Sequence, residues 1–483
     1  ISFLAMPNDH NNVTQLIVDN FSFTPTDDQQ KAIVLLSRFL GDFAAKELFI
    51  LRGYAGTGKT SLLSALVNTL SLIQKRSVLL APTGRAAKVL ASYAQKPAST
   101  IHRKIYRTGS SNGIGFSSIS LQENKHTQTI FIVDEASMIN DTYSGTESFD
   151  SRNILDDLIQ YVYSGDRCKL LLVGDSAQLP PIGSELSAAI DPVQMRVKFG
   201  FDIFTCELKE VLRQQQDSGI LANATYLRRQ IERHKITGKL FKTVGFNDIA
   251  AIDGNQLEEA LNEAYCHYDI DQIAVITRTN KQANLYNREI RSRILFKEES
   301  LSTGDYMMVV KNNYFWLPEE STAGFIANGD IIEIRKVTKR QSMYGFNFLD
   351  TQFTLCDYPD HETVEARLLT NTIDSEAPAL SKQESTDLYE RIKEDYSAIK
   401  SKAKQYATIK KDPWYNALQV KFAYALTCHK TQGGQWSVVF IDQGYLTRNM
   451  INAEYLRWLY TAITRATDKV YLINFHPDFF LEK

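Results

Sequence analysis

The chain has 483 residues, of which 43% are hydrophobic and 23% are charged, with a formal net charge of −2. This length favours more than one domain, and the composition excludes global disorder. A nearly neutral chain can offer a nucleic-acid surface only as a local basic stripe.

The five cysteines are scattered without a C-x-x-C pair, which argues against a disulfide framework or a zinc site and fits a reducing compartment. No apolar stretch reaches the roughly 18 residues that span a bilayer. The first residues, ISFLAMPNDH, lack the pattern of an export signal. We therefore expect a cytoplasmic protein without membrane contact, associated with the nucleoid if the cell is bacterial.

The first strongly patterned segment combines the strand-like run LFILRG, the loop GYAGTGKT at 53–60 and the helical run SLLSALVNTLSLI. The loop fits G-x-x-x-x-G-K-[ST], whose backbone N–H groups wrap nucleotide phosphates. In such a loop the lysine meets the β- and γ-phosphates and the hydroxyl meets Mg²⁺. We expect a nucleoside triphosphate and Mg²⁺ as ligands, and the predicted loop contacts are Gly53, Gly56, Thr57, Gly58, Lys59, Thr60 and Ser61.

Further strand-like runs follow in SVLLAPTG, TIFIVDEA and KLLLVGD, with helical stretches between them. Runs of this kind predict a parallel sheet covered on both faces. Residues 103–129 interrupt the series with the Gly/Ser-rich turn TGSSNGIG between β-like flanks, which predicts a hairpin insertion.

Two of these strands end in polar residues, at the edge of the sheet where ligands bind in open α/β folds. Asp134 and Glu135 follow the run IFIV. We expect Asp134 to join Thr60 in the Mg²⁺ shell and Glu135 to orient and deprotonate the attacking water. An acidic pair after a strand also suits a helix N-cap, but its place 75 residues after the lysine and beyond another strand favours catalysis. The later turn GDSAQLPPIG is either a Pro-terminated loop or a γ-phosphate sensor containing Asp175 and Gln178.

A second α/β series begins near residue 247, with DQIAVITRT, SVVFIDQG and KVYLINF as its strands. Residues 303–369 are all-β with turn signals, as in a small barrel. Residues 376–412 form a charged helical stretch, either a projecting arm or a solvated helix pair. The expected domains are 1–240, then 241–302 together with 421–483, and an insertion at 303–420 that carries the barrel and the arm.

In their order, these segments resemble the superfamily 1 helicases, and within them the RecD/Dda-like (superfamily 1B) group. TDDQQKAI resembles the glutamine motif, APTGRAAKVL motif Ia, STIHR motif Ib, EVLRQ motif IV, TCHKTQGGQW motif V and YTAITRA motif VI. The resemblance covers about 24–475. It implies an α/β fold with two RecA-like parallel-sheet motor domains, the β-hairpin insertion, and a small SH3-like β-barrel insertion with a helical arm.

The resemblance also implies roles for individual residues. Gln29 would contact adenine, and Arg465 would be an arginine finger across a cleft. The implied catalytic set is Lys59, Asp134, Glu135, Gln178, Arg213 and Arg465, and the implied DNA contacts are Pro82, Thr83, Gly84, Thr100, His102, Thr427 and His429. The two histidines are equally compatible with a place in the core.

The hairpin would be the strand-separating pin, with Ile114 and Phe116 near its tip; the alternative is that these side chains pack back onto their own domain. We expect an ATP-dependent, Mg²⁺-requiring DNA helicase that translocates on single-stranded DNA, with 5′→3′ polarity implied by the resemblance. The competing reading is a DNA-stimulated ATPase that remodels or clamps a nucleoprotein partner without unwinding. A nucleotide kinase would leave the second α/β series and Arg465 unused.

The expected partners are single-stranded and forked duplex DNA, with a single-strand-binding or replication protein as a further candidate, and the protein is expected to be a monomer. The sequence leaves open whether it acts in DNA repair, replication or recombination.

Overall fold

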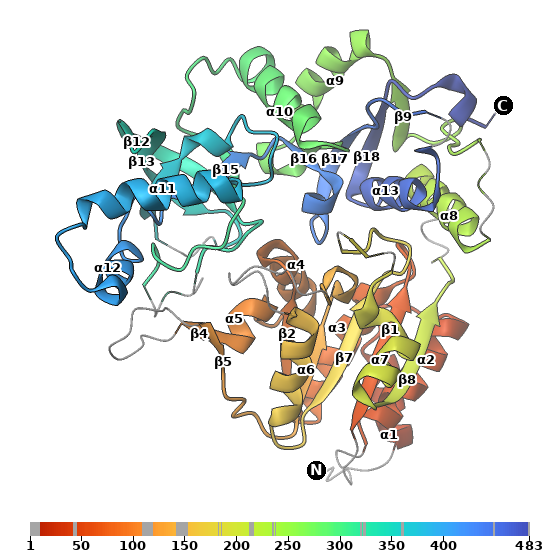
Figure 1. Ribbon diagram of the computed structural model, residues 1–483. Coiled ribbons are helices and arrows are strands. Elements are labelled where there is room, and N and C mark those ends of the chain that lie inside the picture. The colour runs from red at the N-terminus through yellow and green to blue at the C-terminus, as the bar shows by residue number, and fades with distance from the viewer. Residues whose placement is uncertain are drawn as a thin grey trace.

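The computed structural model describes residues 10–41, 46–108, 119–141, 153–181, 183–184, 186–211, 217–233, 236, 238–318, 321, 325–358, 362–447 and 450–481. In Figure 1, one parallel sheet lies in the lower half and another in the upper half, with a β-barrel and a helical arm to one side.

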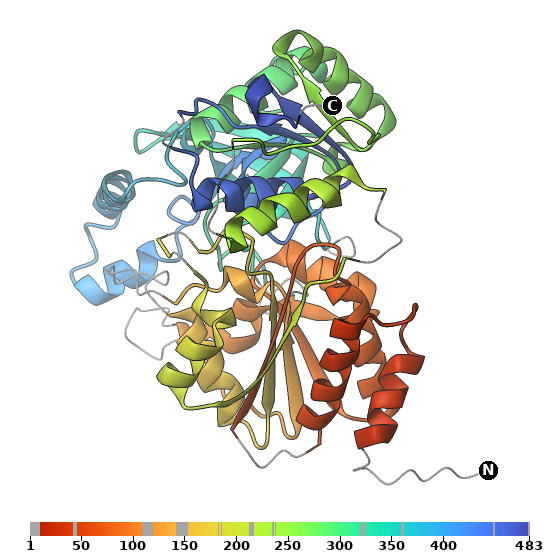
Figure 2. The same cartoon turned by 90° about the vertical axis from the view of Figure 1, so that its right-hand side faces the viewer.

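The first sheet has six parallel strands in the order β3-β2-β6-β7-β1-β8. Successive residues of its strands point to opposite faces, so two cores form. One core contains Phe49 and Ile130, and the other contains Ile50 and Phe131. Helices cover both faces, as Figure 2 shows from the side. The strands are β1 (Glu47–Gly53), β2 (Arg76–Ala81), β3 (Ala98–Thr100), β6 (Thr129–Val133), β7 (Lys169–Gly174) and β8 (Asp202–Leu208), and the helices are α1 (His10–Asp19), α2 (Asp27–Phe39), α3 (Lys59–Leu72), α4 (Gly84–Ala94), α5 (Ile101–Ile105), α6 (Ile154–Ser164) and α7 (Pro192–Phe199).

The second sheet has five parallel strands in the order β16-β10-β17-β18-β9. Its two faces are again covered separately. One core joins the sheet to α9 and α10, and the other joins it to α8 and α13. The strands are β9 (Ile249–Ile252), β10 (Ile273–Thr277), β16 (Ala425–Thr427), β17 (Trp436–Asp442) and β18 (Ala466–Ile473), and the helices are α8 (Gly219–Glu232), α9 (Gly254–His267), α10 (Asn280–Glu289) and α13 (Ala453–Ile463).

Two insertions leave these sheets. Strands β4 (Tyr106–Thr108) and β5 (Ile119–Leu121) pair antiparallel at the predicted hairpin. The larger insertion is a closed barrel formed by β11 (Tyr306–Val309), β12 (Ile331–Met343), β13 (Phe346–Leu355), β14 (Val364–Leu369) and β15 (Leu418–Phe422). The arm, α11 (Lys382–Asp395) and α12 (Lys402–Ile409), lies between β14 and β15 in sequence and packs on the barrel through a small core with Phe348, Ile392 and Ile409.

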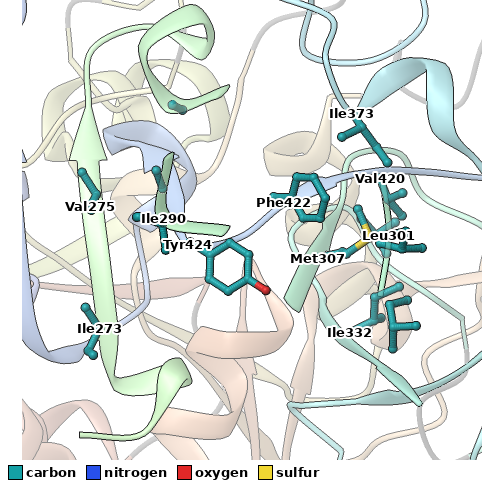
Figure 3. Packing of buried hydrophobic residues seen from close by; sticks show 14 of the residues in the cluster. Ile273, Val275, Ile290, Leu301, Met307, Ile332, Ile373, Val420, Phe422 and Tyr424 are labelled. Atoms are coloured by element: carbon teal, nitrogen blue, oxygen red, sulfur yellow. The ribbon is translucent and has the colours of Figure 1, made fainter. Parts of the chain in front are cut away.

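The barrel and the second sheet share one hydrophobic core. Val275 and Ile290 from the sheet side lie in the same cluster as Met307 and Phe422 from the barrel, with Tyr424 between them (Figure 3). Only two residues separate β15 from β16, so the barrel leads directly into the second sheet.

The predicted fold class is confirmed: two parallel-sheet domains, a hairpin insertion, and a small closed barrel with a helical arm. Helix α8 packs against α13 and shares the core of the second sheet, and Phe241 accepts a backbone N–H from Leu481 at 2.7 Å. We therefore propose a domain limit before α8 instead of the expected limit at residue 240. Since β15 continues to Phe422, we propose that the barrel insertion ends there and not at residue 420.

Within the described part of the chain, no helix is both long and apolar enough to span a membrane. The five cysteines are free thiols.

Asp305 is the buried charged group that joins the barrel to the second domain. Its carboxylate is fully buried and accepts two hydrogen bonds from Arg291, at 3.1 and 2.9 Å, and one from the hydroxyl of Tyr424 at 2.8 Å. Lys297 Nζ lies 3.0 Å from Oδ1, and Ser302 donates its backbone N–H at 2.7 Å.

We predict that Asp305→Ala lowers the free energy of unfolding by about 3–5 kcal/mol, because it leaves the buried charge of Arg291 without its partner. Chemical denaturation measures this loss. The matched control is Glu299→Ala, whose 2.6 Å ion pair with Arg340 is exposed and is worth about 0–1 kcal/mol. Equal losses for the two variants would contradict the prediction.

Candidate active site

Three adjacent strands of the first sheet end in the segments that the sequence singled out. The strand order β6-β7-β1 places Asp134, Asp175 and the glycine loop at the same carboxyl edge. Parallel strands bring such loops together, and this edge is where ligands bind in open α/β sheets.

The glycine loop has the backbone of a phosphate cradle. Gly56 and Gly58 adopt positive φ angles of 73° and 79°, and α3 begins directly after Gly58. Lys59 Nζ donates to the carbonyl oxygens of Gly53 at 2.6 Å and Tyr54 at 3.0 Å. A helix N-terminus with free N–H groups and a lysine ammonium form a site for an anion such as a nucleotide phosphate.

Gln29 lies beneath this loop and is fully buried. Its Nε2 donates to the Thr57 carbonyl at 3.0 Å, and its Oε1 accepts the Thr26 N–H at 2.9 Å in a capping box at the start of α2. The adenine contact implied by the resemblance therefore stays a prediction, while the side chain itself anchors the glycine loop to α2.

Asp134 and Glu135 follow β6 as predicted. Asp134 Oδ1 accepts the Glu135 N–H at 2.8 Å, and Oδ2 accepts the hydroxyl of Tyr93 on α4. Glu135 has a positive φ of 52°, which is rare for a residue with a side chain. Burial raises the pKa of Glu135, and the guanidinium of Arg465 opposes this rise.

Arg465 comes from the turn after α13, in the other domain, and reaches the first sheet. Its side chain is only 5% exposed, and its Nη1 lies 4.0 Å from Glu135 Oε1. The guanidinium also donates to the carbonyls of Thr461 at 3.1 Å and Gly434 at 3.2 Å. The predicted finger thus lies beside the predicted base.

The loop after β7 is held by residues of the second domain. Leu179 donates its N–H to Thr461 Oγ1 at 2.8 Å and accepts from Gln432 Nε2 at 2.6 Å. Arg457 donates to the carbonyl oxygen of Ser176.

A further contact crosses the cleft at Tyr460 on α13. Its hydroxyl donates to Asp175 Oδ2 at 2.6 Å and accepts the Ala55 N–H of the glycine loop at 2.8 Å. Asp175 Oδ2 in turn lies 3.9 Å from Lys59 Nζ. Gln178 is 6% exposed, and its Oε1 has no hydrogen-bond partner among the described residues.

The residues predicted to hold Mg²⁺ fit that ion. Thr60 offers an exposed hydroxyl in the first turn of α3, and each carboxylate oxygen of Asp134 retains a lone pair beyond its one hydrogen bond. Hard oxygen ligands of this kind, completed by phosphate and water, are what Mg²⁺ prefers.

Motifs Ia and V approach each other across the two domains, through Thr83 and Ala86 on one side and Gly433 on the other. Thr83 caps α4 by accepting the Ala86 N–H at 3.2 Å. A Cβ placed on Gly433 of motif V would come within 2.7 Å of Ala86 Cβ and 3.2 Å of Thr83 Oγ1. Pro82 and Gly84 flank this cap in sequence, and Thr427 ends β16 at the start of motif V.

The remaining DNA candidates differ in what they offer. Thr100 is 3% exposed and uses its hydroxyl to cap α5 through the Arg103 N–H at 3.2 Å. Burial lowers the pKa of His102 to about 4 and also lowers the pKa of His429, so both rings are neutral at pH 7. Arg213, Ile114 and Phe116 lie outside the described residues, and their predicted roles stay predictions.

Comparison with known proteins gives separate family matches for the two ends of the chain. The AAA domain family matches residues 27–239, and the UvrD-like helicase C-terminal domain family matches residues 422–473. The ATP-dependent RecD2 DNA helicase of Deinococcus radiodurans is 32% identical over 30% of this chain and 18% of its own length. The ATP-dependent DNA helicase Dda of Enterobacteria phage T4 is 24% identical over 59% of this chain and 60% of its own length.

These matches support the predicted resemblance to the RecD/Dda-like group of superfamily 1 helicases. The chain covers less than two thirds of the length of each of these two relatives. A solved Pif1 helicase from Bacteroides, in complex with ADP-AlF3 and single-stranded DNA, aligns over 96% of this chain and 95% of its own, with 14% identity and a TM-score of 0.46.

Several residues of this site were not predicted from the sequence. Tyr93 and Arg457 contact the predicted loops and lie outside the motifs that the sequence analysis named. Gln432 stands inside TCHKTQGGQW, and Tyr460 and Thr461 stand inside YTAITRA, so their places in the motifs were visible although their contacts were not.

The barrel also contacts the start of α4, through Asp330. This carboxylate is 1% exposed, and only its Oδ2 has a hydrogen-bond partner among the described residues, the Ala327 N–H at 2.7 Å. A Cβ on Gly84 would lie 2.6 Å from Oδ1. Burial, together with the negative charge of Asp357, raises the pKa of Asp330 to about 8.

We predict that Asp330→Asn stabilises the protein, and increasingly so as the pH rises from about 4 to about 8. Between the ordinary pKa of 3.8 and the raised value of about 8, folded Asp330 binds a proton that the unfolded chain has released. Wild-type stability therefore falls by up to about 1.4 kcal/mol per pH unit, relative to the variant. Denaturation at pH 5 and pH 8 tests this, and a pH-independent difference between the two proteins would argue against it.

Proposed function

We propose that this protein is an ATP-dependent DNA helicase that translocates on single-stranded DNA and couples ATP hydrolysis to duplex unwinding, with 5′→3′ polarity. The observation that carries the proposal is the approach of Arg465, from the second domain, to Glu135 of the first. A nucleotide site completed from two domains makes hydrolysis sensitive to the opening of the cleft, which is what a motor requires.

In this proposal each residue of the site has one task. The glycine loop and Lys59 bind and orient the triphosphate, and Thr60 with Asp134 would hold Mg²⁺, which neutralises phosphate charge. Glu135 accepts the proton of the attacking water. Arg465 stabilises the negative charge that develops on the transferred phosphoryl group, with Gln178 and Arg213 as further proposed members of the set.

Burial raises the pKa of Glu135, which makes its carboxylate a stronger base than that of an exposed glutamate. Because a protonated Glu135 cannot accept a further proton, hydrolysis should fall as the pH drops through that raised pKa.

The strand would cross the meeting point of motifs Ia and V. Thr83, Gly84 and Thr427 come from opposite domains, and Gly433 lies against Ala86. Hydroxyl and backbone N–H groups bind phosphates without reading bases, which suits translocation. Because the two halves of this path belong to different sheets, a change in the cleft would move one half along the strand relative to the other.

Strand displacement on forked duplexes that carry either a 5′ or a 3′ single-stranded tail tests this function. We expect ATP- and Mg²⁺-dependent displacement with the 5′ tail only. DNA-stimulated ATP hydrolysis without displacement on either fork would instead support the alternative, an ATPase that remodels or clamps a nucleoprotein partner. The cytoplasmic location and any single-strand-binding partner stay predictions.

We predict that Glu135→Gln retains binding of Mg·ATP but reduces kcat by about 10²–10⁴-fold, because the amide keeps the shape of the side chain and loses its basicity. Nucleotide affinity by fluorescence titration and steady-state ATPase rates separate the two effects. Lys59→Ala serves as the comparison, since it should lose hydrolysis through the phosphate contacts. Loss of nucleotide binding in Glu135→Gln would place this residue in the metal shell or in the fold.

We also predict that replacing residues 108–116 with a short Gly-Ser turn spares DNA-stimulated ATPase activity and single-strand translocation but strongly reduces unwinding. Strands β4 and β5, which pair antiparallel, flank this segment in the sequence. Unstacking a base pair costs on the order of 1–2 kcal/mol, so an apolar tip there would bias the fork toward opening. Full-rate unwinding by the variant would move the wedge to another part of the molecule, the barrel first.

A further inference from the structure

Tyr460 is a buried side chain whose hydroxyl makes two hydrogen bonds between the domains. It is 1% exposed, and its hydroxyl both donates and accepts across the cleft, to Asp175 Oδ2 at 2.6 Å and from the Ala55 N–H at 2.8 Å. Burial raises the pKa of Tyr460 well above its ordinary value, so the hydroxyl keeps its proton and remains a donor.

Both partners of this hydroxyl belong to the nucleotide site. Ala55 is the third residue of the glycine loop, and Asp175 Oδ2 lies 3.9 Å from Lys59 Nζ. Lys59 Nζ in turn donates to the carbonyl oxygens of Gly53 and Tyr54 in the same loop. The contacts form a closed circuit that runs from the loop to the lysine, to Asp175, to Tyr460 and back to the loop.

The same helix carries Arg465 to its place. Thr464 Oγ1 donates to the Tyr460 carbonyl at 2.8 Å, and Arg465 Nε donates to the Thr461 carbonyl at 3.1 Å. The last turn of α13 therefore sets the position of the Arg465 guanidinium. Tyr460 lies in this turn, and its hydroxyl contacts the glycine loop.

We propose that Tyr460 is a positioning residue for hydrolysis: its hydroxyl fixes α13 against the glycine loop and Asp175, and so sets the place of Arg465 beside Glu135. This inference rests on the proposed function. When phosphate contacts shift the glycine loop or Lys59, the hydroxyl passes that shift to α13, and through it to the finger.

Tyr455 provides a matched control on the same helix. It is 3% exposed, and its hydroxyl donates at 2.5 Å to Gln443 Oε1, which belongs to the same domain. Tyr455→Phe and Tyr460→Phe each remove one buried hydroxyl from α13, but only the second removes a contact that crosses the cleft.

The test compares steady-state ATP hydrolysis of the two variants, at a temperature well below both thermal midpoints. We expect Tyr460→Phe to lower kcat by at least about tenfold, which is about 1.4 kcal/mol, with KM for ATP changed by less than about threefold. Tyr455→Phe should stay close to the wild-type kcat. Equal rates for the two variants would overturn the proposal, as would a loss confined to KM.

A double-mutant cycle with Arg465→Ala then separates positioning from packing. If Tyr460 acts through the finger, adding Tyr460→Phe to Arg465→Ala lowers kcat by less than about twofold further. Losses that multiply would show an independent, structural contribution and overturn the proposal. A wild-type protein that hydrolyses no ATP would contradict the proposed function itself, and this outcome is distinct from equal rates in the two variants.

Discussion

The active-site geometry depends on the hydrogen bonds that hold α13 and motif V against the loops of the first sheet. The Arg465–Glu135 pair at 4.0 Å is too long to fix the two domains by itself. Thr461, Gln432 and Tyr460 add contacts of 2.8, 2.6 and 2.6 Å to Leu179 and Asp175. These contacts are buried, and a buried hydrogen bond that breaks leaves its partner unsatisfied at a cost of about 1–3 kcal/mol. The two domains are thus held in a defined arrangement, and separating them costs free energy.

Burial at the proposed active site creates an electrostatic cost, as is common where a protein tunes a catalytic carboxyl group. Glu135 is removed from water and lies near Asp134 and Asp175, and both features raise its pKa. The opposing cations, Arg465 and Lys59, come from different domains. Separating the domains would leave Glu135 with one cation fewer, so the pKa of this proposed base depends on the distance between the two domains.

The parts of this structure that follow from local pattern could be predicted from the sequence. Apolar runs alternating with helices gave both parallel sheets, and the glycine loop and the acidic pair lie at strand ends because the chain places them directly after those strands. The T-x-x-Q pattern at Thr26 and Gln29 forms a capping box, which the sequence analysis did not predict.

The other features of the structure depend on contacts between segments that lie far apart in the sequence, and no local pattern predicts such contacts. Tyr460 meets Ala55 across 405 positions of the chain. Asp330 lies against Gly84 only because the barrel is placed over α4. Helix α8 follows the first sheet in sequence but packs on α13. Its apolar face alone does not indicate which of the two domains it packs against.

The order of strands in the second sheet has a consequence for biosynthesis. All strands of the first sheet lie between Glu47 and Leu208, so they leave the ribosome as one block. Among the described residues, strand β9 pairs with β18 alone, and α8 packs against α13, which follows it by more than 200 residues. At about 5–20 residues per second, the apolar face of α8 would stay uncovered for on the order of ten to forty seconds. The apolar residues of α8 therefore stay exposed to water during the synthesis of the second domain. Binding by a chaperone, or packing against the completed first domain, would protect them from aggregation during this time.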